Sequence, residues 1–382
     1  MELELWTDKG PSSLPQRAVG VEAAALVGMI DLPSDTAAAC SPGALRIAMG
    51  AALFALTNAF STALYRNGGA TVVSLYIVRS AIVYLINGLL VAWNDGWEEA
   101  NNVLFLRVSS EAARVVLARS LLNATKACLL SISFVFLTYA DAFTVFKGIG
   151  TFSTVIVARL LLGSSERLSL HELACGAFTI FGIVLIAQPP AIFGEDTPPP
   201  PPPPSASAAE AAAVWVPRAG WGLALATLSG GLSAFSGSLM RLLSNAAGPF
   251  KLTPNMTLSY LMSTMLGFFG CVALACRATG IAEVPGWEWS ALVWPVSLTE
   301  WALVGGHCVC ALGAWLATGA GYATTRAGMV AFLQLTEIPW VYVLDVLALG
   351  EPTSLLAGVG SAIVFASAVA AGCGVAESQR GG

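Results

Sequence analysis

Charged residues are scarce in this chain. Asp, Glu, Lys and Arg make up 11% of its 382 residues, and only two residues are histidines. Soluble domains carry roughly 25% charged residues, which keep the surface hydrated. Lys and Arg form no basic cluster interleaved with aromatic residues, so the sequence argues against nucleic acid as a partner.

Signatures of catalysis and metal binding are also lacking. The sequence has no H-E-x-x-H pair, no phosphate-binding glycine loop and no nucleophile elbow. The eight cysteines are scattered, and the closely spaced Cys308 and Cys310 have no second pair or histidine cluster to complete a metal site. We therefore expect no enzyme, no cofactor and no metal, and we expect the cysteines to pack between helices.

Apolar residues, in contrast, make up 56% of the chain. A helix of about 20 apolar residues crosses the hydrocarbon core of a bilayer, and runs of that length fill most of the sequence after residue 43. We therefore predict an all-α integral membrane protein. Ten transmembrane helices are expected at residues 45–65, 70–93, 115–137, 140–162, 168–188, 219–243, 255–277, 299–321, 326–348 and 353–374.

The expected helices divide the chain into two halves. Residues 1–43 are predicted to be a disordered cytosolic tail without a cleavable signal peptide, because no basic region precedes an apolar core there. Two five-helix repeats are expected at 44–188 and 219–374, followed by a short cytosolic tail at 375–382. The Pro/Ala-rich segment 189–218 includes an unbroken proline run, which favours polyproline II and cannot cross lipid, so it is expected to be an external linker.

Two segments of the chain resemble each other. LLLGSSERLSLHELACGAFTIFGIVLI (160–186) and VLALGEPTSLLAGVGSAIVFASAVAAG (346–372) each place a Gly and a nearby Glu between apolar runs. The sequence Ala59-Phe60-Ser61 also returns as Ala234-Phe235-Ser236. Many transporters build a central site from two such halves. Because five helices per half is an odd number, the two repeats are expected to be inverted relative to each other.

The distribution of Lys and Arg predicts the orientation. Cytosolic loops of membrane proteins carry an excess of these residues. With a cytosolic amino terminus, the cytosolic side holds Lys9, Arg17, Arg46, Arg107, Arg114, Arg167, Arg241, Lys251, Arg326 and Arg380, and the opposite side holds Arg66, Arg218 and Arg277. Both termini are therefore expected in the cytosol. The sequence leaves open whether the membrane is the plasma membrane or an endomembrane, and whether the protein forms a homodimer.

The junction between the fourth and fifth predicted helices resembles that of the EamA-type drug/metabolite transporters. A leucine, a glycine and a glutamate followed by a glycine-bearing helix occur at 162–168, where Ser164 and Ser165 stand between Gly163 and Glu166, and again at Leu349-Gly350-Glu351. The phrase GIVLIAQPP (182–190) is similar to the solute carrier family 35, group G branch. Over residues 44–374, this resemblance implies two inverted five-helix repeats and the transport of a metabolite.

Ionisable residues within the predicted spans are the main functional candidates, because charge is costly inside a bilayer. In the helix at 140–162, polar residues recur at helical spacing: Asp141, Thr144, Lys147, Thr151 and Thr154. They share one face, and Gly148 and Gly150 allow a backbone or a solute to approach it closely. We expect this face to line a central cavity, with Lys147 as a binding or gating group. A packing seam of small polar residues is the alternative.

Further cations occur in the second and third predicted helices. Arg119, Asn123 and Lys126 form a stripe in which Lys126 lies deeper, so Lys126 is the site candidate and Arg119 either contributes or snorkels to the cytosolic boundary. Arg79 is a second candidate for binding solute, with a structural salt bridge as the alternative. Its counterpart in the other half is Ser263, so this charge belongs to one half only.

The ninth predicted helix carries charge of the opposite sign. Gln334, Glu337 and Asp345 fall near a common face, and Pro339 frees a backbone carbonyl close to Glu337. Glu337 is expected to pair with Lys147 or to bind a proton, and Asp345 either couples protons or reaches the interface.

Three polar residues complete the set of candidates. Asn58 and Ser236 are expected to line the cavity from the first and sixth helices. His307, in Gly305-Gly306-His307, is a candidate proton relay, with a packing role as the alternative.

These patterns predict a secondary transporter that moves a small polar metabolite, with a carboxylate or zwitterionic head, by alternating access. The expected partners are this solute and the lipid bilayer. The resemblance also implies a nucleotide-sugar or sugar-phosphate exchanger as an alternative, although the spans after Arg277 hold no Lys or Arg except Arg326 at a helix end. A non-transporting membrane scaffold or regulator is the third possibility.

Overall fold

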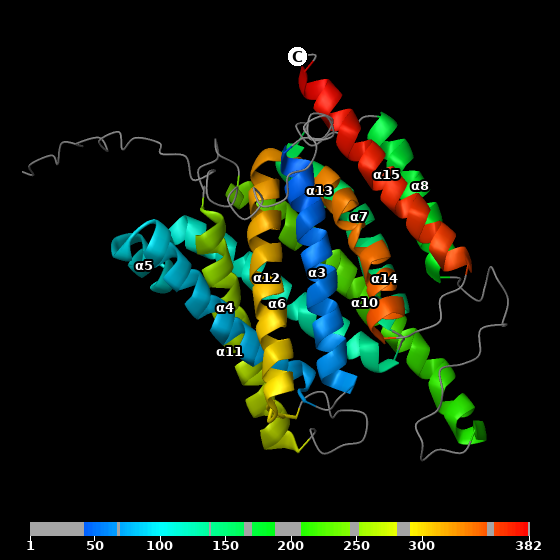
Figure 1. Cartoon of the computed structure of the whole chain (residues 1–382), viewed down its shortest axis with the longest axis horizontal. Helices are drawn as coiled ribbons and strands as arrows, with labels where there is room; N and C mark the ends of the chain where they lie inside the picture. Colours follow the sequence, from blue (N-terminus) through cyan, green and yellow to red (C-terminus); the bar gives the residue numbers. More distant parts are fainter. Residues whose placement is uncertain are drawn as a thin grey trace, which may run out of the picture. The chain divides into compact units, whose positions relative to one another are not determined.

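The computed structural model describes residues 42–66, 69–136, 139–163, 170–187, 208–244, 252–280, 291–349 and 355–380. These residues form helices joined by turns and short loops, and they contain no β-strand (Figure 1). The helices are α3 (Pro42–Arg66), α4 (Val72–Asn94), α5 (Trp97–Leu104), α6 (Ser110–Phe136), α7 (Tyr139–Leu162), α8 (Leu170–Ala187), α10 (Ala208–Ser244), α11 (Pro254–Thr279), α12 (Leu298–Thr324), α13 (Ala327–Gln334), α14 (Glu337–Leu349) and α15 (Leu355–Arg380).

Most of these helices have the dimensions of membrane spans. Among the residues that the structure describes, eight helical segments are long and apolar enough to cross a bilayer: α3, α4, α6, α7, α10, α11, α12 and the combined α13–α14. Shorter apolar stretches occur at Leu173–Leu185 in α8 and at Gly358–Ser367 in α15. The protein is therefore an all-α, multi-pass membrane protein, as the apolar runs predicted.

The helix expected over 326–348 is broken in two. Residues 335 and 336 separate α13 from α14, and their backbone N–H groups donate to carbonyls three residues back, from Leu335 to Phe332 at 3.0 Å and from Thr336 to Leu333 at 3.2 Å. Pro339 explains the break, since its ring clashes with the carbonyl four residues earlier and it has no N–H to donate. The broken helix therefore begins its second part at Glu337.

Other boundaries also differ from the sequence-based expectation. The short amphipathic helix α5 was not expected, and α6 begins at Ser110 rather than near 115. Helix α10 begins at Ala208, inside the segment predicted as a linker, because its Ala-rich start has high helix propensity. The proline run of that linker, the second Gly-Glu step (Gly350-Glu351) and most of the amino-terminal tail lie outside the described residues.

The helices pack in pairs that link the first and second parts of the chain. Helix α3 packs against α12, and α6 packs against α10. In the same way α3 packs against α14, and α10 packs against α7. Helices α4 and α11 form another pair, and α8 and α15 lie side by side (Figure 1).

Glycines allow the closest of these crossings. A Cβ built on Gly230 of α10 would lie 2.7 Å from the Phe146 carbonyl oxygen and 3.0 Å from the Gly150 nitrogen of α7. A Cβ on Gly182 of α8 would lie 2.8 Å from the Gly360 oxygen of α15. Small residues at such positions let membrane helices gain van der Waals contact backbone to backbone.

Candidate functional site

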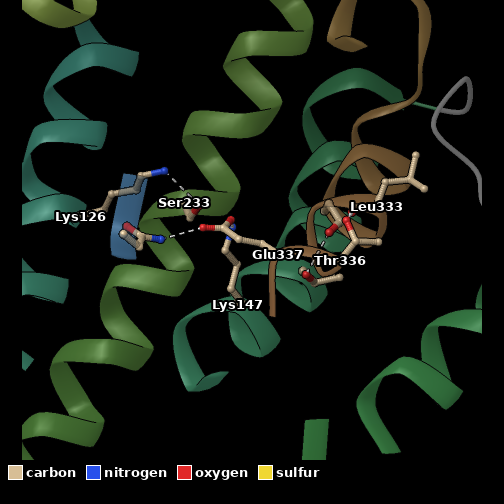
Figure 2. Close-up of polar contacts among 9 residues, drawn as sticks. Lys126, Lys147, Ser233, Leu333, Thr336 and Glu337 are labelled. Carbon is tan, nitrogen blue, oxygen red and sulfur yellow. Dashed lines mark hydrogen bonds and ion pairs between the residues drawn. The ribbon is translucent and has the colours of Figure 1, made fainter. Parts of the chain in front are cut away.

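A buried ion pair joins α7 to α14. The Lys147 Nζ lies 2.5 Å from the Glu337 Oε2, and the two side chains are 14% and 3% exposed (Figure 2). From α3, the Asn58 Nδ2 donates to the other carboxylate oxygen, Glu337 Oε1, at 2.9 Å. Glu337 therefore connects three helices that are far apart in the sequence.

The break between α13 and α14 positions the Glu337 carboxylate. Glu337 is the first residue of α14, where the helix dipole favours a negative charge. The Thr336 Oγ1 donates to the Leu333 carbonyl at 2.7 Å, which satisfies one backbone group of the broken segment (Figure 2).

The ion pair lies at the edge of a cavity of about 150 Å³. Because one water needs ~10–15 Å³ on this scale, the cavity has room for roughly ten non-hydrogen atoms. Aromatic rings form part of its wall, and the Lys147 Nζ lies 5.2 Å from the Phe143 ring centre and 5.8 Å from that of Phe146. The predicted site residues that line the cavity are Asn58, Arg79, Lys126, Lys147, Ser236, Gln334 and Glu337.

Polar groups of α6 and α10 form another part of the wall. The Lys126 Nζ donates to the Ser233 Oγ at 3.3 Å (Figure 2). The Ser229 Oγ donates to the Lys126 backbone carbonyl at 2.8 Å, and the Asn123 Nδ2 donates to the Ser236 Oγ at 2.5 Å. These bonds hold α6 and α10 together while the Lys126 ammonium faces the cavity.

Two buried arginines complete the lining. Arg79 is 8% exposed and Arg119 is 2% exposed. The Arg79 Nη2 donates to the Met265 Sδ at 3.3 Å, and the Arg79 guanidinium lies 4.2 Å from the Tyr76 ring centre. The Arg119 guanidinium lies 5.8 Å from the Trp315 ring centre.

Positive charge exceeds negative charge in this cavity. Four basic side chains line it, those of Arg79, Arg119, Lys126 and Lys147, whereas Glu337 is the one carboxylate among its described lining residues. Ionised groups inside a membrane protein normally pair with each other or with a ligand. The arrangement can therefore hold an anion.

Several predicted site residues lie elsewhere. Thr144 and Thr151 are buried on α7 but do not line the cavity, and the Thr151 Oγ1 donates to the Ala331 carbonyl of α13 at 3.4 Å. The His307 Nδ1 lies 3.0 Å from both the Ser61 Oγ and the Thr57 carbonyl, so His307 connects α12 to α3. The side chains of Asp141 and Asp345 lie outside the part of the chain that the structure describes.

The sequence stripe on α6 already contained the signal for Arg119. Its spacing to Asn123 and Lys126 places all three on one helix face, and all three line the cavity. Arg119 lies nine residues after the start of α6 at Ser110, about two and a half turns into the helix. Within the described residues, no three His, Cys, Asp or Glu side chains lie close enough to hold a metal ion.

Comparison with known proteins supports the fold but does not identify a family. No family model matches the chain, and no curated protein matches it. A solved structure described only as "Crystal structure of protein" is similar over 86% of this chain and 96% of its own, with a TM-score of 0.59 and 16% identity. At this identity the likeness shows a shared fold and nothing about activity.

Proposed function

We propose that the protein is a secondary transporter that moves a small organic anion across the membrane by alternating access. The observation that carries this proposal is the cavity, which four basic side chains and one carboxylate line among the described residues. A charged residue at the centre of a membrane helix costs ~2.5–3.5 kcal/mol. An anionic solute offsets that cost with charge-assisted hydrogen bonds.

The helices form two inverted five-helix repeats in this proposal, giving ten spans. One repeat contains α3, α4, α6, α7 and α8, and the other contains α10, α11, α12, α13–α14 and α15. The packing pattern supports this assignment, because exchanging the repeats turns the pair α3/α12 into α10/α6 and the pair α3/α14 into α10/α7. The pairs α4/α11 and α8/α15 exchange into themselves, as expected for helices on either side of a two-fold axis.

The Lys147–Glu337 pair acts as a gate in this arrangement. Helices α7 and α14 are equivalent elements of the two repeats, so the 2.5 Å ion pair fastens one repeat to the other. An anionic group of the solute competes with Glu337 for the Lys147 ammonium. Once the ion pair opens, the two repeats are free to rock relative to each other, which is the motion of alternating access.

The size of the cavity favours a small solute over a nucleotide sugar. A cavity of about 150 Å³ accommodates roughly ten non-hydrogen atoms as it stands, whereas a nucleotide sugar needs the lining to open further. We also propose that the chain is related to the EamA-type transporters and to the solute carrier family 35, group G branch. Both termini lie in the cytosol in this proposal.

Efflux from loaded vesicles tests the proposal. Proteoliposomes containing the purified chain are loaded with a mixture of organic acids, amino acids and sugars, and mass spectrometry measures what leaves. We expect the wild-type protein to release organic anions faster than protein-free liposomes and to retain neutral sugars. Lys147→Gln should abolish this release, whereas Arg159→Gln should not, since Arg159 is exposed on the same helix and away from the cavity. Release that is indifferent to Lys147→Gln would overturn the proposal.

A further inference from the structure

Arg79 and Arg119 are not used by the Lys147–Glu337 gate. Both residues line the same cavity, and both side chains are more than nine-tenths buried. They come from different walls, Arg79 from α4 and Arg119 from α6. Their role therefore needs a separate explanation.

Both guanidinium groups retain buried N–H donors without a partner. The Arg79 Nε has no hydrogen-bond acceptor, and neither the Nε nor the Nη1 of Arg119 has one. The bond from the Arg79 Nη2 goes to the thioether of Met265 at 3.3 Å, and sulfur is a weak acceptor. A buried donor that belongs to a charged group normally has an acceptor. Leaving it without one costs more than the ~1–3 kcal/mol that an unpaired neutral donor costs.

Aromatic packing does not compensate for these missing bonds. Arg79 over Tyr76 and Arg119 near Trp315 are cation–π contacts, which contribute ~0.5–2 kcal/mol each. Such contacts leave the in-plane N–H groups free and hold each guanidinium plane in position. The three unpartnered nitrogens are shielded from water in this conformation, so an acceptor that enters the cavity pairs with them once the surrounding side chains shift.

Along α6, Arg119 lies apart from Lys126. Arg119 and Lys126 are seven residues apart on one face of α6, which corresponds to about 10.5 Å along the helix axis. The Lys126 ammonium is bonded to Ser233, and Lys147 is bonded to Glu337. A solute carboxylate at Lys147 thus leaves the guanidinium groups without an acceptor unless the solute carries a second anionic group.

We infer that Arg79 and Arg119 form a second anion subsite, so that the transported solute is a small dianion with one anionic group at Lys147 and another at these guanidinium groups. This inference rests on the proposed function. The second group is a carboxylate or a phosphate, because both accept paired hydrogen bonds from a guanidinium fork. When all four basic side chains are ionised, Glu337 and two solute carboxylates leave the cavity with one excess positive charge, and a fully ionised phosphate in place of one carboxylate leaves none.

Binding to the purified full-length chain tests the inference without transport. The probes are succinate, its monomethyl ester, which keeps one carboxylate at similar length, and phosphoglycolate, which replaces one carboxylate with a phosphate. Titration of tryptophan fluorescence or of the thermal midpoint gives each dissociation constant. We expect the wild-type chain to bind succinate or phosphoglycolate about tenfold or more tightly than the ester, since a hydrogen bond to a charged group contributes ~1.5–3 kcal/mol. The tighter of these two ligands identifies the second group, with phosphoglycolate carrying close to three negative charges at pH 7 because the second phosphate pKa is about 6.

Substitutions locate the source of that preference. Arg119→Gln and Arg79→Gln should each lower dianion affinity by about tenfold while changing ester affinity by less than about threefold. Arg119→Lys keeps the charge but loses the fork, so it should bind the dianion with intermediate affinity. Arg114→Gln is the matched control, because Arg114 is exposed on the same helix and does not line the cavity. The thermal midpoint of each variant without probe shows whether it is folded.

The results separate this inference from the proposed function. If the ester binds as tightly as succinate and phosphoglycolate, or if Arg119→Gln weakens the ester and these two ligands equally, the second subsite is rejected. The proposed function survives that result as long as ester binding is lost in Lys147→Gln. If no probe binds and Lys147→Gln changes nothing, both proposals fail.

Discussion

Removing one partner of the Lys147–Glu337 pair should destabilise the protein more than removing both. The Nζ–Oε2 distance is 2.5 Å, and the side chains are 14% and 3% exposed, so the pair is largely shielded from water. Breaking a buried pair from one side costs ~3–5 kcal/mol, because an uncompensated charge remains. In Lys147→Met, the Glu337 carboxylate would keep only its hydrogen bond from Asn58. We therefore expect Lys147→Met to lower the free energy of unfolding by about 3 kcal/mol or more.

A double-mutant cycle measures the coupling directly. Glu337→Gln should also destabilise the chain, because it leaves the Lys147 ammonium buried among other cations. The double variant Lys147→Met/Glu337→Gln removes both charges, so its loss should be smaller than either single loss and should fall short of their sum by about 3 kcal/mol or more. The assay is reversible unfolding in mixed micelles by titration with sodium dodecyl sulfate. Arg159→Met on the exposed face of α7 is the control and should change stability by less than ~0.5 kcal/mol. Single losses that add to within ~0.5 kcal/mol would refute the buried pair.

Three further predictions concern the backbone and the topology. Pro339→Ala restores an N–H and removes the ring that breaks the helix at residues 335 and 336, so anion uptake should fall without loss of thermal stability. Gly230→Ala places a Cβ 2.7 Å from the Phe146 carbonyl oxygen and should lower the free energy of unfolding by about 1–3 kcal/mol. The control Gly231→Ala places a Cβ with nothing within 4 Å and should leave that free energy unchanged. Equal losses in the two variants would contradict the close crossing of α7 and α10. In a cysteine-free background, Glu98→Cys should react with an impermeant thiol reagent from the cytosolic side and Val296→Cys from the other; the same side for both would contradict the proposed topology.

The positions of the helices were predictable because apolar composition and length are local properties of the sequence. Each run of about 20 apolar residues has to satisfy its backbone internally in lipid, so a helix is the outcome wherever such a run occurs. The break at residues 335 and 336 was harder to predict, since Pro339 signals a disturbance in the preceding turn without fixing its extent. That break decides where Glu337 lies relative to α7.

The sequence predicts which candidate site residues share one helix face. It does not predict which residues of different helices come into contact. Helical spacing places Asn123 and Lys126 with Arg119 on α6. The depth of Arg119 depended on where α6 begins, and the start at Ser110 places it well inside the helix. Contacts between distant helices, such as the bond from Asn58 to Glu337 at 2.9 Å, depend on tertiary packing that no local pattern specifies.

The initial rate of uptake of a labelled organic anion into proteoliposomes tests the central claim most directly. The wild-type chain and Lys147→Gln are compared at equal protein density, with Arg159→Gln as the control. Our account predicts saturable uptake by the wild-type chain and the control, and uptake at the protein-free rate for Lys147→Gln. Equal uptake by all three chains, or uptake by none of them for any small organic anion, would contradict it.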